Sequence, residues 1–337
     1  TPSNSARSRS SSVAGAPAMR GSAVEGVSVL DKGGARTLRA PVVIDATADG
    51  DIAARAGATI MQGDPDGGRI QMCNFRYAIE EADAAAWGAA RMPAEEIERL
   101  CVEAQRAGEL HPPRGVFAPT PESFPFDRRS RKLALTYWEL AGIDPTDPVA
   151  LSAALVECQA AALEVVLFCR RRLPGYARCR PARLPALLGT RESRRILGEY
   201  LLTADDVLKA AKFPDGIARA SFWFDFHDPP PGTTLPYPDD YVRSTRPAPG
   251  DWYEIPYRCL LPKGIDGLLV AGRCISTDRP AQASMRIMPT CCALGAAAGI
   301  GAAMSAKGGL VPRAVDGREL KRRLVPDGPI AGPERWR

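Results

Sequence analysis

Residues 254–306 read EIPYRCLLPKGIDGLLVAGRCISTDRPAQASMRIMPTCCALGAAAGIGAAMSA, which is two short apolar runs followed by a long segment of small residues. The first run, Ile255–Leu261, predicts a short strand. The second, Leu268–Ala271, has the continuous apolar pattern of a fully buried strand. Gly272 ends this run, and a backbone without a Cβ atom can approach a ligand closely there.

The small-residue segment is expected to be a helix that starts at Met288-Pro289-Thr290. Proline suits a first turn because the N–H that it lacks would have no partner within the helix. Gly295, Gly299 and Gly301 lower its helix propensity. We therefore expect its backbone to press against a sheet or a flat ligand. The free N–H groups of its first turn would point at an electron-rich or anionic group.

An earlier segment has the same strand-to-ligand character. Ala23–Leu30 and Arg36–Ile44 are predicted strands, joined by the hairpin turn Asp31–Gly34. The second strand ends in small and acidic residues, Asp45–Asp51, as strands do where an open α/β sheet holds its ligand. Asp51–Ala56 is then expected to be a short helix.

Three stretches together resemble FAD-dependent oxidoreductases with a glutathione-reductase-like flavin domain, kin to the flavin-containing subunit of heterodisulfide reductase. They are VVIDATADGDIAARAGA (42–58), LLGTRESRRILGEYLLTADDV (187–207) and the C-terminal stretch quoted above. The resemblance implies an α/β fold in which part of an FAD-binding sheet domain carries an inserted, α+β substrate or cap domain. It also implies electron or hydride transfer through FAD, with a small-molecule substrate or a redox partner.

The resemblance further implies which residues contact the flavin. They are Ala46, Thr47, Ala48, Asp49, Gly272, Arg273, Cys274, Met288, Pro289 and Thr290. The family usually has glycine in place of Ala48, and many flavoproteins of this fold have an acidic residue in the loop that here holds Arg273 and Cys274.

The fingerprint G-x-G-x-x-G, which holds the FAD pyrophosphate in such flavoproteins, does not occur in the sequence. We therefore expect the chain to be a truncated product that binds FAD weakly by itself. The alternative is a non-catalytic remnant that binds no flavin. Relatives in the wider group carry four-iron clusters, but the sequence has no C-x-x-C or other cluster-ligand motif, and we expect no metal site.

The candidate catalytic residues are Arg191, Arg194 and His227. If Thr190–Arg195 is extended, arginines project from both of its faces, where they could bind a carboxylate or offset charge on the reduced flavin. The alternative is a solvated edge strand in which Glu192 pairs with Arg194 or Arg195.

His227 is the one histidine in the matched regions that could act as an acid or base near neutral pH. It follows Asp225-Phe226, and its family counterpart also follows an acidic–apolar pair. A structural role beside the neighbouring prolines is the alternative.

Composition excludes several classes. The net charge of +5 is modest and spread out, which argues against a nucleic-acid surface. Thr290–Met304 is too short and too glycine-rich for a membrane span. The sequence also lacks the G-x-S-x-G motif of serine hydrolases, which argues against that class.

Nine cysteines without framework spacing indicate reduced thiols in a cytoplasmic protein. Adjacent Cys291 and Cys292 would form a strained disulfide, so buried packing is expected.

These patterns predict the following domain organisation. Residues 1–21 form a disordered tail, 22–60 and 251–310 form the two parts of the FAD-binding domain, 61–250 form the inserted domain, and 311–337 form a C-terminal tail with a short helix.

Overall fold

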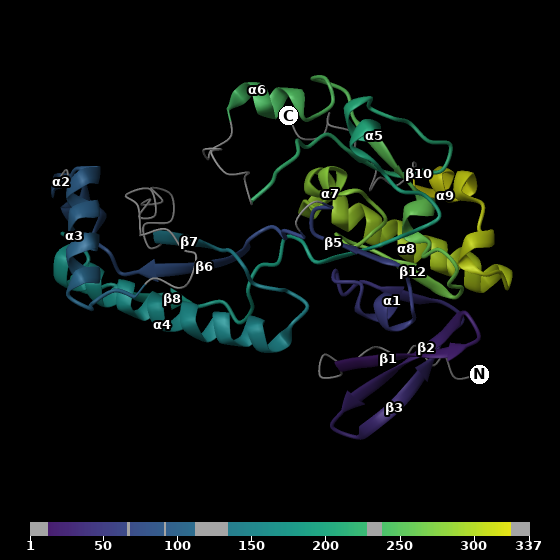
Figure 1. The fold of residues 1–337 in the computed structure, drawn as a ribbon, viewed down its shortest axis with the longest axis horizontal. Helices are drawn as coiled ribbons and strands as arrows, with labels where there is room; N and C mark the ends of the chain where they lie inside the picture. The colour runs from purple at the N-terminus through teal and green to yellow at the C-terminus, as the bar shows by residue number, and fades with distance from the viewer. Residues whose placement is uncertain (1–12, 66–67, 91, 112–133, 228–237, 325–337) are drawn as a thin grey trace. The chain divides into compact units, whose positions relative to one another are not determined.

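The structure, a computed structural model, describes residues 13–65, 68–90, 92–111, 134–227 and 238–324 (Figure 1). It has an α/β fold. Contacts divide the chain into two compact units: a discontinuous unit, residues 1–68 with 194–337, and an inserted unit, residues 69–193. The inserted unit is shorter than the segment 61–250 expected from the sequence, because residues 61–68 and 194–250 belong to the discontinuous unit.

The discontinuous unit begins with a three-stranded antiparallel sheet, β1 (Val13–Arg20), β2 (Ala23–Asp31) and β3 (Gly34–Arg39). The predicted hairpin is confirmed, with Asp31 opposite Gly34. The predicted disordered tail is wrong for Val13–Arg20, since this segment pairs with β2 along its length. Backbone pairing of this kind needs no apolar periodicity in the sequence. Residues 1–12 of the predicted tail lie outside the described residues.

Two strands from opposite ends of the chain form a parallel pair in the discontinuous unit. β4 (Val43–Asp45) lies beside β12 (Leu268–Val270), with Leu269 opposite Ile44. β12 is fully buried, as predicted. The predicted strand Arg36–Ile44 is instead divided into β3 and β4 around Pro41, which has no N–H to donate to a ladder.

The helices beside this parallel pair start where the sequence predicts. α1 (Asp51–Arg55) follows β4, and α8 (Met288–Gly308) begins at the predicted proline and packs against both strands. The predicted strand Ile255–Leu261 is wrong beyond Pro256, where a 3₁₀ turn, η2 (Tyr257–Leu260), begins.

The rest of the discontinuous unit consists of short elements. Its remaining strands pair antiparallel, β5 with β9 and β10 with β11. The elements are β5 (Ile60–Gln62), β9 (Arg194–Ile196), α5 (Ala204–Leu208), β10 (Gly216–Ala220), α6 (Asp239–Ser244), β11 (Tyr253–Pro256), α7 (Arg279–Met285), η3 (Pro312–Ala314) and α9 (Gly317–Leu324). Thr203 caps α5 in a capping box with Asp206.

The inserted unit is a three-stranded antiparallel sheet with helices. The strand order is β7-β6-β8, and α4 runs along β6 and β8 (Figure 1). The elements are β6 (Cys73–Glu80), α2 (Ala84–Ala90), α3 (Ala94–Arg106), β7 (Ala134–Leu140), α4 (Pro148–Arg172) and β8 (Arg180–Arg183). Asp147 caps α4, accepting a hydrogen bond from the Val149 amide.

Two helices, α4 and α8, are long and apolar enough to cross a membrane by length and composition. In each, 39% of the apolar window is buried inside the protein. A core helix of a folded domain meets the same criterion, so this is weak evidence for a membrane span.

Candidate functional site

Asp45 organises the loop that leaves β4. Its side chain is 1% exposed and accepts hydrogen bonds from the Thr47 amide and hydroxyl at 3.1 and 2.7 Å. It also accepts from the amides of Ile52 and Ala53 in the first turn of α1, both at 2.9 Å. A carboxylate suits this place because helix N-termini carry free N–H groups and partial positive charge. The loop Asp45–Asp51 is therefore held from inside by one side chain.

The loops after β4 and β12 contact each other at the carboxyl ends of the strands. The Ala271 amide donates to the Asp45 carbonyl at 2.9 Å. Ala48 and Gly272 both have positive φ, 65° and 93°. A Cβ atom on Gly272 would lie 3.8 Å from the Cβ of Ala48. Ala48 thus adopts the left-handed conformation that favours glycine, the residue that the family resemblance implies there.

Two arginines bind the β4–α1 loop. Arg273 pairs with Asp49 at 2.6 Å. Arg194 pairs with Asp51 at 2.8 Å and donates to the Asp49 carbonyl at 3.3 Å. The structure therefore brings Arg194, predicted as catalytic, to the loops predicted to hold the cofactor.

The start of α8 exposes its backbone. Its N-cap residue, Ile287, provides no side-chain hydrogen bond. Met288 is 82% exposed, Pro289 is exposed and Thr290 is buried. Among the residues that the structure describes, none accepts a hydrogen bond from the amide of Met288 or Thr290. The first turn of α8 thus presents donors without protein acceptors.

The Cys291 thiol, in the first turn of α8, is influenced by two arginines. Burial raises the pKa of its thiol to about 11, while the positive charges of Arg273 and Arg286 act in the opposite direction. Both guanidiniums are therefore close enough to influence the first turn of α8 electrostatically. The Arg273–Asp49 ion pair joins the predicted segments Asp45–Asp51 and Gly272–Ile275. The helix α8, which begins with the third segment, Met288–Thr290, packs against β4 and β12.

The glycines and cysteines of α8 differ in their surroundings. Gly295 and Gly299 face open space among the described residues, whereas Gly301 lies close to the Tyr257 ring. Contact of the helix backbone with a flat ligand stays a prediction. Cys291 is half-buried but Cys292 is exposed, so buried packing is wrong for Cys292. Both cysteines are free thiols.

His227 lies near the same turn. Its Nε2 is 3.3 Å from the Asp225 carboxylate. Arg286 donates to the Asp225 carbonyl at 2.7 Å and to its carboxylate at 3.1 Å. Arg286 directly precedes Ile287, so the His227–Asp225 pair is anchored at the start of α8.

Arg191 has a different environment. It belongs to the inserted unit, is 6% exposed, and binds the Met72 carbonyl at 2.6 Å and Glu139 at 2.8 Å. Glu192 is fully buried and accepts from the Gln71 amide at 3.1 Å. The alternative of a solvated edge strand is therefore wrong, because Arg191, Glu192 and Arg195 are all buried. Arg191 and Arg194 belong to different units.

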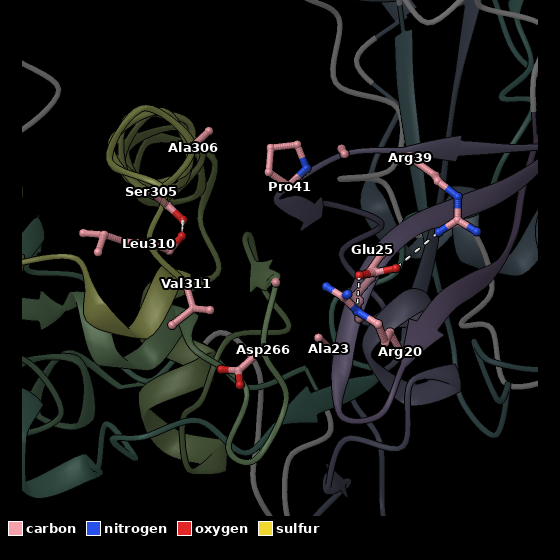
Figure 2. Close-up of a pocket in the computed structure, with 14 residues that line it drawn as sticks. Arg20, Ala23, Glu25, Arg39, Pro41, Asp266, Ser305, Ala306, Leu310 and Val311 are labelled. Carbon is pink, nitrogen blue, oxygen red and sulfur yellow. Dashed lines mark hydrogen bonds and ion pairs between the residues drawn. The ribbon is translucent and has the colours of Figure 1, made fainter.

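A cavity of about 570 Å³ lies elsewhere in the discontinuous unit (Figure 2). Its lining includes Pro41 and Gly267, which precede β4 and β12, and residues at the end of α8. Glu25 there pairs with Arg20 at 2.5 Å and with Arg39 at 3.3 Å. This cavity is at the amino ends of the parallel strands, whereas open α/β sheets bind ligands at the carboxyl ends. It is therefore separate from the candidate site.

A family model described as FAD dependent oxidoreductase matches residues 9–324, nearly the whole chain. The chain belongs to this family and is an oxidoreductase that uses FAD. Nothing matches it in the comparisons with curated proteins and with solved structures.

The residues at the candidate site suit the isoalloxazine end of FAD. The ring has a polar edge rich in hydrogen-bond acceptors, and the first turn of α8 offers amide donors with no protein acceptor among the described residues. The Arg273 Nε atom is also buried there, and no described residue accepts a hydrogen bond from it. In the part of the chain that the structure describes, no group of three or more His, Cys, Asp or Glu side chains could hold a metal ion.

Proposed function

We propose that the flavin ring of FAD binds at the start of α8, between the loops Asp45–Asp51 and Gly272–Ile275. The observation that carries this proposal is the uncapped first turn of α8, with the amides of Met288 and Thr290 and the charge of Arg273 beside it. When bound, FAD supplies the electron- or hydride-transfer chemistry, and the protein positions the ring and tunes its electronics.

In this arrangement each nearby side chain has its own role. Arg273 and Arg194 hold the β4–α1 loop through Asp49 and Asp51, and their positive charges favour negative charge on the flavin. His227 holds or releases a proton at Nδ1 or Nε2, while Asp225 and Arg286 fix its position. Arg191, within the inserted unit, is proposed to act on the substrate side.

The finer kinship is also a proposal. The parallel pair β4–β12, with small-residue loops at its carboxyl ends, supports a glutathione-reductase-like flavin domain akin to that of the flavin-containing subunit of heterodisulfide reductase. Because the sequence has no G-x-G-x-x-G turn, we propose that the 337-residue chain by itself binds FAD weakly. The free thiols of all nine cysteines support a cytoplasmic location. The oxidised or reduced partner is proposed to be a small molecule or an electron-transfer protein.

The site is tested by capping α8. In Ile287→Asp the new carboxylate accepts hydrogen bonds from the amides of the first turn and adds negative charge. FAD affinity, measured by fluorescence titration, should fall at least about tenfold, or about 1.4 kcal/mol. Ile287→Ser, which caps without a charge, should weaken FAD binding less.

Pro93→Asp is the matched control, because Pro93 is the uncapped N-cap residue of α3 in the inserted unit. It should leave FAD affinity unchanged. If Ile287→Asp retains wild-type affinity while circular dichroism shows an intact fold, the flavin ring does not bind at the start of α8. If the wild-type chain shows no FAD binding at any concentration, the alternative of a non-catalytic remnant is favoured.

A further inference from the structure

The long helix of the inserted unit, α4, has two apolar faces, and in the part of the chain that the structure describes only one of them is covered. The inward face packs into the core of this unit through Cys158, Ala162, Val165, Phe168 and Cys169, among others. The outward face carries the α4 stripe, an exposed row that consists of Val149, Ala153, Val156, Ala160, Leu163 and Leu167. A continuous exposed apolar row of this kind marks an interaction surface.

The stripe is strongly exposed along its whole length. Val149 and Val156 are 74% and 66% exposed, and Leu163 and Leu167 are 47% and 45% exposed. Successive members are four, three, four, three and four residues apart. This is the a/d repeat with which one helix packs against another in a coiled coil. From Val149 to Leu167 the stripe extends roughly 27 Å, at about 1.5 Å per residue.

We propose that the α4 stripe binds the α4 stripe of a second copy of this chain, with the two helices antiparallel. The stripe is symmetric in sequence about Cys158, so that an antiparallel copy brings Val149 to Leu167, Ala153 to Leu163 and Val156 to Ala160. Each larger side chain near the middle meets a smaller one, as interdigitating helices require. The same surface of each copy would form the interface, as in most twofold-symmetric dimers.

The surface has a recess where the partner's leucines would enter. An open hollow lies over the first half of the stripe, lined by Pro148, Val149, Ser152, Ala153, Val156 and Glu157. In the antiparallel register, Leu163 and Leu167 of the second copy lie over this hollow. Apolar side chains that enter such holes are what hold paired helices together.

Charge at the ends of α4 selects the antiparallel direction. Asp144 and Asp147 lie at its amino end, and the exposed residues Arg170–Arg172 lie at its carboxyl end. Antiparallel helices place the acidic end of each beside the basic end of the other and align their dipoles favourably. A parallel pair would instead place the three arginines of each copy together, with Glu109 beside Arg171 and Arg172 offsetting part of their charge.

A lipid bilayer is the less favoured occupant of this face. The inward face of α4 belongs to the core of the inserted unit, and the basic residues are confined to one end of the helix. Helices that lie on membranes typically have basic residues along the polar face.

A contact of one helix per copy is small beside the roughly 800 Å² per partner of a standard interface. We therefore expect a micromolar dissociation constant.

Sedimentation velocity of the full chain, over about 1–100 μM, tests this directly because dimerisation depends on concentration. We expect a monomer–dimer equilibrium that the double substitution Val156→Glu/Leu163→Glu shifts at least about a hundredfold toward monomer. Leu187→Glu is the matched control, since Leu187 is 80% exposed in the same unit but lies outside α4. It should leave the equilibrium unchanged.

Direction is tested by oxidative cross-linking in a Cys292→Ser background, which removes the exposed native thiol. Mixing Val149→Cys with Leu167→Cys should give a disulfide-linked pair, and Val149→Cys alone should not. In the antiparallel pair, two copies of residue 149 are roughly 27 Å apart along the helix. A parallel dimer would reverse this result and overturn the register.

The proposal is overturned if the chain stays monomeric at every concentration or if the double substitution leaves a dimer intact. Sedimentation of the wild-type monomer with vesicles, abolished by the double substitution, would assign the stripe to a lipid surface and also overturn it. Circular dichroism of each variant shows whether the fold is retained. None of these readouts depends on FAD or on the proposed flavin site.

Discussion

Arg273 and Asp49 form an ion pair with an Nη2–Oδ1 distance of 2.6 Å, although 224 residues separate them in the sequence. The pair joins the loop after β12 to the loop after β4, at the ends of the two parallel strands. Both side chains are largely buried, 13% and 25% exposed. The Arg273–Asp49 ion pair therefore stabilises the candidate site more than an exposed surface pair would.

The first prediction concerns the Arg273–Asp49 ion pair. Arg273→Met should lower the free energy of unfolding by about 1–3 kcal/mol, because Asp49 is left with less compensation for its burial. Urea denaturation measures the change. A double-mutant cycle with Asp49→Asn should give a coupling above about 0.5 kcal/mol.

Arg99→Met is the matched control, since Arg99 pairs with Glu96 and Glu103 on the exposed surface of α3. Exposed pairs contribute little, so the denaturation midpoint should not move measurably. Equal effects of the two substitutions would show that the Arg273–Asp49 pair is no tighter than a surface pair.

Ala48→Gly should stabilise the protein. At φ 65°, an alanine is strained by about 1–2 kcal/mol, and glycine avoids this at an entropic cost of about 0.5–1 kcal/mol. We expect a net gain of up to about 1 kcal/mol, seen as a higher melting temperature. Ala296→Gly, at an exposed position inside α8, should do the opposite and lower stability by about 1 kcal/mol.

The local rules that relate sequence to structure account well for the strand β12, the starts of α4, α5 and α8, and the β2–β3 hairpin. In each case a few neighbouring residues decide the outcome: a buried apolar run, an N-cap, a proline or a turn. For β4 and β12 the prediction extended only to a shared domain of residues 22–60 and 251–310, and their parallel pairing is a finding of the structure.

What could not be predicted depends on residues that are distant in sequence. Val13–Arg20 becomes a strand only because β2 offers its backbone. The role of Asp45 depends on α1 folding back over it. Arg191 and Arg194 are only three residues apart, yet the boundary between the two units lies between them. The alternation of side chains along a strand does not indicate where such a boundary falls.

Cys291 should react slowly with iodoacetamide at neutral pH, because burial raises the pKa of its thiol to about 11 and the thiolate is the reactive form. The raised pKa means that folding favours the neutral thiol, so the stability from this group is lost as the pH rises toward 11. In a Cys292→Ser variant, which leaves Cys291 as the only cysteine that is not fully buried, the modification rate should rise about tenfold per pH unit between pH 8 and 10.

Mass spectrometry of peptides from the modified protein measures this rate. A rate that levels off below pH 8 would mean that Arg273 and Arg286 outweigh burial and that Cys291 is an activated thiol.

The last prediction concerns Asp45, which accepts four hydrogen bonds while almost fully buried. Asp45→Asn removes the charge and turns an amide N–H₂ toward at least one donor. Stability should fall by about 2–4 kcal/mol, because buried donors are left unpaired and the N-terminus of α1 loses its carboxylate. For a unit of this size the melting temperature should fall by roughly 5–15 °C.

Asp31→Asn is the matched control, because Asp31 also accepts from a backbone amide two residues ahead, that of Gly33, but in a hairpin whose turn residues 32–34 are exposed. Its only other change among the described residues is the loss of an ion pair with the exposed Arg36. This substitution should change stability by less than about 1 kcal/mol. If Asp45→Asn is equally mild, the loop Asp45–Asp51 is held mainly by the Arg194 and Arg273 ion pairs, and Arg273→Met should then be the more damaging of the two substitutions. The order of the two effects thus decides whether the candidate site is organised from inside the β4–α1 loop or from the arginines that bind it.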